Sequence, residues 1–101
     1  MAVYTSGDWY AKPGKESEFV EVWREMAEWT GAEFDMDGWA KLLRDKEDPT
    51  YFRSVAEWAD EKVVEQWRTS DGFKQRMAKA RELLTDMRIH AMDAVVEVET
   101  K

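Results

Sequence analysis

The order of strand-like and helix-like segments constrains the fold of this chain more than any other feature of the sequence. Segments rich in aromatic and β-branched residues and bounded by turn residues indicate strands, whereas apolar residues at helical spacing indicate amphipathic helices. The sequence therefore predicts a strand, a helix, a hairpin, a second helical region and a final strand. The expected strands are residues 3–11, 39–44, 51–58 and 94–99.

The two helical regions are indicated by apolar stripes that begin after turn or capping residues. The first is expected at residues 15–30, after the turn Lys-Pro-Gly at 12–14. The second starts with a short piece at 60–67, and the capping residues 69–71 open a longer helix. The expected apolar stripe of this longer helix is Phe73, Met77, Ala80, Leu84 and Met87.

The β-α-β-β-α-β order is that of the ferredoxin-like split arrangement. It predicts an α+β fold in a single domain over residues 1–101, in which both helical regions cover one face of a four-stranded antiparallel sheet. Apolar residues occur on both faces of the expected strands, and Tyr51, Val55 and Val95 are expected on the face away from the helices. A sheet with one wet face should alternate cleanly between apolar and polar residues. We therefore expect a second sheet against that face, and hence a homodimer.

Charge and hydropathy exclude several classes of partner. With 15 basic and 22 acidic residues the formal charge is −7, so the chain lacks the basic surface that nucleic-acid binding requires. No apolar run is long enough to cross a membrane, and the first residues carry no signal pattern. A cytoplasmic protein without nucleic-acid or membrane partners is expected.

The residue types that are missing limit the chemistry. The chain has no cysteine, no asparagine and a single histidine, His90. Thiol nucleophiles and iron–sulfur ligation are thereby excluded, and a zinc or other transition-metal site is not expected. The stretch DMDG at 35–38 resembles a calcium loop, but its glycine comes too early and Lys46 stands at the last ligand position. We interpret this stretch as a turn and expect neither a metal nor a cofactor.

Longer stretches carry a family resemblance. The turn KPG, the hairpin LLRDKEDPTYF and the segment SVAEWADEKVVEQWRTSDGF together resemble the antibiotic biosynthesis monooxygenase domain, over nearly the whole chain. The resemblance implies a dimeric ferredoxin-like α/β barrel. The family groups cofactor-free quinone-forming oxygenases with haem-degrading and other enzymes, so it implies the fold more specifically than the reaction.

The haem-degrading members use an asparagine on the first strand, a tryptophan in the second helical region and an iron-ligating histidine after it. Trp67 matches the tryptophan, but Gly7 stands at the asparagine position. The histidine position falls at Arg76 or Met77. Haem degradation is therefore not expected.

The anthrone-oxidising members line the substrate pocket with a tryptophan at the end of the third strand, an asparagine and a tyrosine. Trp58 matches the tryptophan, whereas Ser54 replaces the asparagine and Val64 replaces the tyrosine. The resemblance thus implies an aromatic wall, with the Ser54 hydroxyl as a hydrogen-bond donor.

From these matches we expect a mostly apolar pocket between sheet and helices for a small aromatic ligand. Its expected residues are Trp9, Ser54, Trp58, Trp67, Phe73 and Met77. The tryptophans fit ordinary core equally well, because tryptophan supplies a large buried area. Trp23 and Trp29 are expected to be core or dimer contacts. No catalytic residue is identified, and His90, Asp8 and Glu57 remain alternative bases.

Three classes of function remain open. The first is a cofactor-independent monooxygenase acting on a small aromatic or polyketide-like molecule: a base removes an acidic proton, and the resulting anion reacts with O₂. The second is a non-catalytic binder of small apolar molecules. The third is a structural dimer module whose pocket is filled by side chains.

Overall fold

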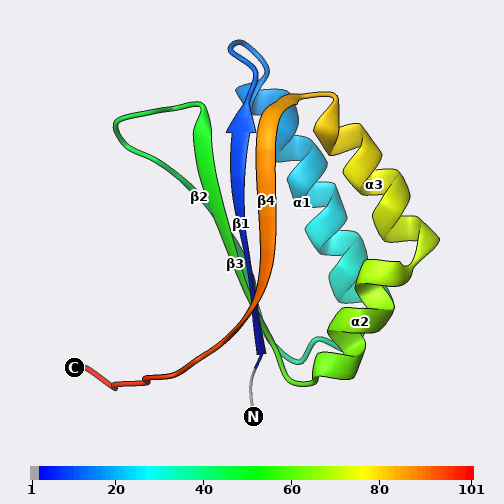
Figure 1. Ribbon diagram of the computed structural model, residues 1–101, viewed down its shortest axis with the longest axis vertical. Helices are drawn as coiled ribbons and strands as arrows, with labels where there is room; N and C mark the ends of the chain where they lie inside the picture. Colours follow the sequence, from blue (N-terminus) through cyan, green and yellow to red (C-terminus); the bar gives the residue numbers. More distant parts are fainter. Residues whose placement is uncertain (1–2) are drawn as a thin grey trace.

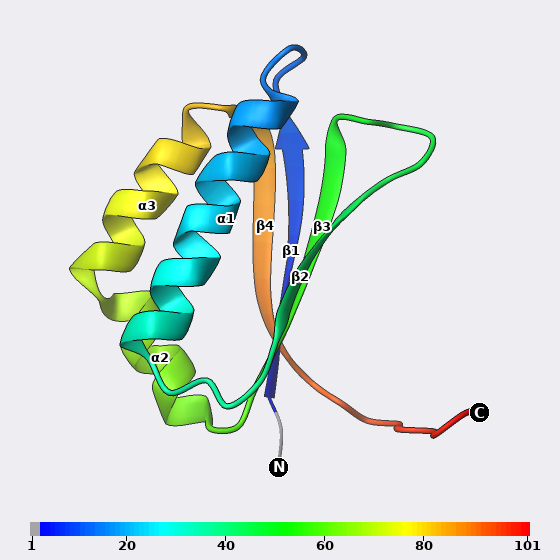
Figure 2. The same ribbon diagram turned by 180° about the vertical axis from the view of Figure 1, so that it is seen from behind.

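The computed structural model describes residues 3–101 and has two layers, an antiparallel sheet and a layer of helices. The strands are β1 (Val3–Ala11), β2 (Ala40–Arg44), β3 (Tyr51–Trp58) and β4 (Leu84–Asp93), and the helices are α1 (Glu16–Glu33), α2 (Glu61–Thr69) and α3 (Asp71–Arg81). All the helices lie on one side of the sheet (Figure 1), as the view from behind also shows (Figure 2). The predicted ferredoxin-like α+β fold is confirmed, with the second helical region divided into α2 and α3.

The strand order β2-β3-β1-β4 places β1 in the middle of the sheet and leaves β2 and β4 as its edges. Trp9 of β1 lies opposite Phe52 of β3 and Met87 of β4. Alternate residues of β1 turn toward the helices, so that Thr5, Trp9 and Ala11 are buried there. This side of the sheet and the apolar stripe of α1, in which Phe19 is fully buried, form the core.

The last strand corrects the sequence prediction. Residues Leu84 and Met87 were expected to extend the second helix, but α3 ends at Arg81 and both residues belong to β4. Their spacing suits a helix, yet pairing with β1 turns Met87 and Ile89 toward the core at strand spacing. Tertiary pairing therefore overrides the local periodicity.

Residues 94–99, expected as the final strand, form no strand. The pairing of β1 with β4 ends at Val3 and Asp93, so β1 has no described residue left to pair with the following segment. The tail runs away from the sheet beyond β4 (Figure 1). The exposed fractions of Val95, Val96 and Val98 are 89%, 77% and 76%.

Side-chain caps determine where the second helical region breaks. The Asp60 carboxylate accepts the backbone N–H of Lys62 and begins α2. The Ser70 hydroxyl accepts the N–H of Phe73 at 3.2 Å and donates to the carbonyl of Trp67 at 2.8 Å, which ends α2 and begins α3. The capping signal predicted at residues 69–71 is confirmed, and the turn at Ser70 aims Trp67 and Phe73 at the same region of the core.

The face of the sheet away from the helices carries mixed side chains. Tyr51 and Val55 lie there half-buried, beside the charged pair Asp8 and Arg53. Val95, expected on the same face, lies in the exposed tail instead. Within residues 3–101 no helix is long and apolar enough to span a lipid bilayer.

Candidate functional site

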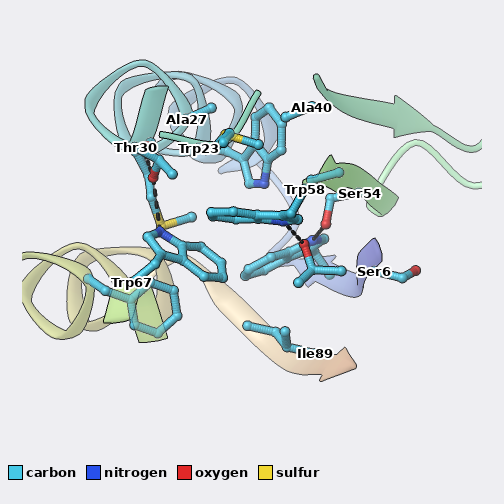
Figure 3. Close-up of a pocket in the computed structure, with 15 residues that line it drawn as sticks. Ser6, Trp23, Ala27, Thr30, Ala40, Ser54, Trp58, Trp67 and Ile89 are labelled. Atoms are coloured by element: carbon cyan, nitrogen blue, oxygen red, sulfur yellow. Dashed lines mark hydrogen bonds between the residues drawn. The ribbon is translucent and has the colours of Figure 1, made fainter. Parts of the chain in front are cut away.

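A small inner cavity lies between the sheet and the helices. Its walls include Trp9 of β1, Ser54 and Trp58 of β3, Trp67 of α2 and Phe73 of α3. The ring centroids of Trp58 and Trp67 are 4.9 Å apart (Figure 3). Phe73 meets Trp67 edge-on, with ring centroids 4.5 Å apart. The cavity volume of about 50 Å³ holds a few water molecules, whereas sites for drug-sized ligands measure ~300–1,000 Å³.

A hydroxyl group accepts the indole N–H of three of the four tryptophans that line the cavity. Trp9 donates to Ser54 at 2.9 Å, Trp58 to Thr5 at 3.0 Å and Trp67 to Thr30 at 3.0 Å. These bonds hold the rings in fixed orientations, and in residues 3–101 no buried side-chain nitrogen or oxygen is left without a partner. The dashed lines in Figure 3 follow them across the cavity.

Two of these hydroxyls keep a proton to donate. Thr30 uses its own O–H for the carbonyl of Met26 at 2.7 Å. Thr5 and Ser54 accept an indole N–H, but within the described chain neither makes a hydrogen bond as a donor. Because a hydroxyl is both donor and acceptor, they can donate to a carbonyl or phenolate oxygen inside an otherwise apolar cavity.

The candidate bases lie on the other face of the sheet. Asp8 and Glu57 alternate with the cavity-facing residues Trp9 and Trp58 along their strands, and His90 is paired with Ser6. Among residues 3–101, no acid, histidine, lysine or arginine lines the inner cavity. The cavity can therefore orient and desolvate a ligand, but it supplies no ionisable group to accept a proton.

Two acids on the open face, Asp8 and Glu57, accept hydrogen bonds from neighbouring tyrosines. Tyr51 donates to Asp8 at 2.6 Å, and this hydrogen bond, reinforced by Arg53, holds the pKa of Asp8 below its usual range. Tyr4 donates to Glu57 at 2.8 Å, and this bond raises the pKa of Tyr4 to about 12. The lowered pKa makes Asp8 a weak proton acceptor, and the raised pKa keeps Tyr4 protonated at neutral pH.

Of the pocket residues expected from the sequence, Trp9, Ser54, Trp58, Trp67 and Phe73 come together around the inner cavity. Met77 does not join them. It is 4% exposed and packs in the core beside a separate groove between α3 and β4.

At Gly7, where the haem-degrading members have asparagine, the structure leaves no room for a side chain. A Cβ atom there would lie 2.7 Å from Nε1 of Trp9 and 2.8 Å from Oγ of Ser54. The Trp9–Ser54 pair thus fills the space above Gly7. With this space filled and no histidine facing the cavity, the residues present do not fit haem.

Sequence reasoning missed the residues that orient the tryptophans, namely Thr5 and Thr30. A signal was available, because Thr5 shares the strand parity of Trp9 and Thr30 ends the apolar stripe of the first helix. Trp23, expected as core or as a dimer contact, also lines the cavity, whereas Trp29 packs over Gly72 and Arg76 of α3. The DMDG stretch lies in the irregular loop after α1, and no cluster of potential metal ligands occurs in residues 3–101.

A model of the family described as antibiotic biosynthesis monooxygenase matches residues 3–79, from the start of β1 to near the end of α3. The chain belongs to this family. The match includes all of the strands and helices that build the inner cavity except β4. No curated protein sequence matches the chain.

Solved structures show the same fold at low sequence identity. SnoaB from Streptomyces nogalater, a cofactor-independent oxygenase, aligns with TM-score 0.86 and 19% identity over 98% of each chain. A conserved protein from Methanosarcina mazei aligns with TM-score 0.79 and 23% identity over 91% of each chain. A Pseudomonas aeruginosa protein aligns with TM-score 0.77 and 18% identity, over 94% of this chain and 95% of its own. At such identities the likeness concerns the fold.

Proposed function

We propose that this member of the antibiotic biosynthesis monooxygenase family is a cofactor-independent monooxygenase for a small aromatic or polyketide-like molecule. The proposal rests on one observation above all. The inner cavity is apolar and aromatic, and it contains the hydroxyl donors Thr5 and Ser54 without an ionisable group. Such a site suits a ligand that carries its own acidic proton.

In the proposed reaction the substrate contains an acidic ring CH₂ group, as in an anthrone, and loses a proton to water to form an enolate or phenolate. Ser54 and Thr5 donate hydrogen bonds to its oxygen, and the apolar walls remove the water that would otherwise stabilise the anion. The anion transfers an electron to O₂, and the resulting radicals combine at the ring carbon. Loss of water then leaves a carbonyl, so that CH₂ and O₂ become C=O and H₂O.

Substrate entry requires movement of the cavity wall, because about 50 Å³ is too small for a fused ring system. Phe73 is the best candidate for this movement. It is only half-buried, and it also borders the groove between α3 and β4. Rotation of its ring would open the cavity toward that groove.

The reaction is tested with anthrone-like and hydroquinone substrates under ¹⁸O₂, without added metal or flavin. Label should enter the quinone product faster than with heat-inactivated protein. Ser54→Ala should slow this incorporation, whereas Ser17→Ala, on the exposed side of α1, should leave it unchanged. Absence of labelled product with every substrate contradicts the proposal.

The pH profile tests the absence of a protein base. If the substrate ionises before it enters, the pH dependence of kcat/KM should follow the pKa of the substrate and shift when the substrate is changed. A profile that stays the same for substrates of different acidity points to a titrating group of the protein.

A non-catalytic binder of small apolar molecules is the alternative, and the lack of an ionisable group at the cavity favours it. Native mass spectrometry of the purified protein would show a retained ligand. Binding of the aromatic substrates without incorporation of label supports this alternative. If the protein neither binds nor converts these compounds, the result supports the third class of function, a structural module with a filled core.

We also propose that the protein acts as a homodimer in which the open face of the sheet and the tail after Asp93 meet a second copy. The support is physical: the tail is extended and exposes Val95, Val96 and Val98. The open face adds Leu43, 52% exposed, and Met92, 49% exposed. Exposed apolar surface that gathers on one side of a protein often marks a protein–protein contact.

A further inference from the structure

A second and larger hollow, the outer groove, lies between α3 and the edge strand β4, outside the inner cavity. Its cavity volume is about 480 Å³, within the ~300–1,000 Å³ that small-molecule sites occupy. Figure 1 shows β4 at the edge of the sheet, where no further strand covers it. The groove is therefore open to solvent along one side.

The floor of the outer groove is apolar. Phe73 and Met77 come from one face of α3, and Met87, Ile89 and Ala91 come from the helix side of β4. Met77 is buried, whereas Phe73, Met87 and Ile89 are half-buried and remain partly open to the groove. A flat apolar group laid on this floor would cover surface that is now in contact with water.

The rim of the outer groove is cationic. Lys74 and Arg81 lie on one stripe of α3, with Ala78 between them at helical spacing, and Arg68 comes from the last turn of α2. All three cationic side chains belong to exposed residues, and none of them forms an ion pair within residues 3–101. The described groove lining contains no carboxylate. His90 lines the groove from β4, but the strand register turns its side chain to the open face of the sheet.

This concentration of positive charge is unusual for a chain of net charge −7. Some lysines and arginines elsewhere on the molecule form ion pairs with acids, as in the pairs of Lys15 with Glu18 and of Arg24 with Glu21. Around the outer groove the cations have no such partners, so the local potential attracts anions. An apolar floor beneath a cationic rim selects a ligand that is apolar on one side and anionic on the other.

We propose that the outer groove binds a small amphipathic anion, a carboxylate attached to a flat aromatic or acyl body. The body lies on Phe73, Met77 and Ile89, and Arg81 and Lys74 hold the carboxylate through charge-assisted hydrogen bonds. The groove shares Thr5, Phe73 and Ile89 with the inner cavity. A bound anion would therefore touch the same Phe73 ring that borders the cavity, but its binding does not depend on turnover there.

Binding is tested with 2-naphthoate against ¹⁵N-labelled full-length protein, followed by NMR titration. Naphthoate should shift the amide signals of α3 and β4, and added salt should weaken its binding. The neutral isostere 2-naphthamide should bind at least about tenfold more weakly, because it lacks the charge that the rim recognises. Equal binding of the two compounds, or no shifts at α3 and β4, would overturn the proposal.

Two double variants separate the effect of the cationic rim from the effect of net charge. Lys74→Gln with Arg81→Gln should weaken naphthoate binding by about tenfold or more. Lys62→Gln with Lys79→Gln removes the same charge from exposed helix positions outside the groove and should leave the affinity unchanged. Equal weakening in both double variants would mean that net charge alone attracts the ligand, and it would refute a defined site.

The same titration tests two competing occupants of the outer groove. Inorganic phosphate that binds as tightly as naphthoate would show a general anion site without a role for the apolar floor. The second competing occupant is the tail of a second copy, represented by a peptide of residues 94–101, which contains Glu97 and Glu99. Displacement of naphthoate by that peptide at equal concentration would overturn the small-molecule proposal, whereas its failure to compete supports it.

Discussion

Four tryptophans line the inner cavity, and a hydroxyl group accepts the indole N–H of three of them, Trp9, Trp58 and Trp67. The pairing allows Trp58 and Trp67 to be almost fully buried, at 1% and 8% exposure, without the cost of an unsatisfied donor. Their burial therefore suits a rigid core and a ligand wall equally well. What distinguishes the site from ordinary core is the pair of hydroxyls, Thr5 and Ser54, that retain a proton facing an apolar space.

Truncation of Trp67 measures how much of the core depends on this arrangement. Trp67→Ala should lower the free energy of unfolding by ~3–5 kcal/mol, because it removes a buried ring and leaves a cavity beside Trp58 and Phe73. The same change at Trp39, 42% exposed, is the control and should cost much less. Urea denaturation followed by circular dichroism measures both. Equal losses for the two variants would contradict the assignment of Trp67 to the core.

The open face of the sheet makes a prediction about pH. The pKa of Tyr4 is raised from 10.0 to about 12, chiefly by the hydrogen bond to Glu57 at 2.8 Å and further by loss of hydration and by the charge of Glu97. Since the folded pKa is above the unfolded value, this bond contributes its full stability below the unfolded pKa. The contribution is lost as the pH rises through the interval up to about 12.

NMR of carbon-13-labelled tyrosine resolves this titration from that of the other tyrosines. Glu57→Gln should return the pKa of Tyr4 toward 10.0. Asp8→Asn, which removes the carboxylate bound by Tyr51, should leave Tyr4 unaltered. A Tyr4 titration that does not move in Glu57→Gln would show that another charge controls it.

Among the helices, the break between α2 and α3 decides the shape of the site. One serine, Ser70, bonds both the last turn of α2 and the first turn of α3, and the turn carries Trp67 and Phe73 into contact at 4.5 Å. A continuous helix through these residues would place the two rings at a different angle. The cap therefore positions two walls of the cavity.

Replacement of Ser70 tests this role. Ser70→Ala should cost ~0.5–2 kcal/mol of stability, because the N–H of Phe73 loses its acceptor, and Ser70→Asp should restore most of the loss. Thr69→Ala is the matched control, since its hydroxyl bonds only carbonyls of its own helix. Chemical denaturation gives the free energies. If Ser70→Ala and Thr69→Ala cost the same, the cap does not hold the break.

For the molecule as a whole, the tail after Asp93 and the open face of the sheet bear on assembly. Light scattering at micromolar concentration should give about twice the chain mass of 11.9 kDa. A chain truncated after Asp93 keeps every described strand and helix, so it should fold, but its mass should move toward that of one chain. A full-length monomer, or a truncated chain that still pairs, would contradict the part assigned to the tail.

Local sequence patterns predicted most of the elements correctly, because their signals lie within a few residues of one another. Val3–Ala11 and Tyr51–Trp58 have the predicted bounds, and the caps and turns lie where Ser70 and the Lys-Pro-Gly turn indicated. The final strand was misplaced because its signal is ambiguous. Leu84 and Met87 continue the helical spacing of α3, and the alternation in 94–99 is typical of a strand. Only the register with β1, in which Asp93 pairs with the first described residue, Val3, places that tail beyond the described sheet.

The sequence by itself determined the fold class, most of the aromatic residues that line the inner cavity and the absence of thiol chemistry, because each of these depends on residue type and local spacing. Tertiary structure alone decided which face of the sheet each side chain occupies. It separated Asp8, Glu57 and His90 from the cavity, set Thr5 and Thr30 against the indoles, and placed Arg68, Lys74 and Arg81 around one groove. The physical reason is that these relations join residues far apart in the chain, through strand register and helix packing that no local pattern records.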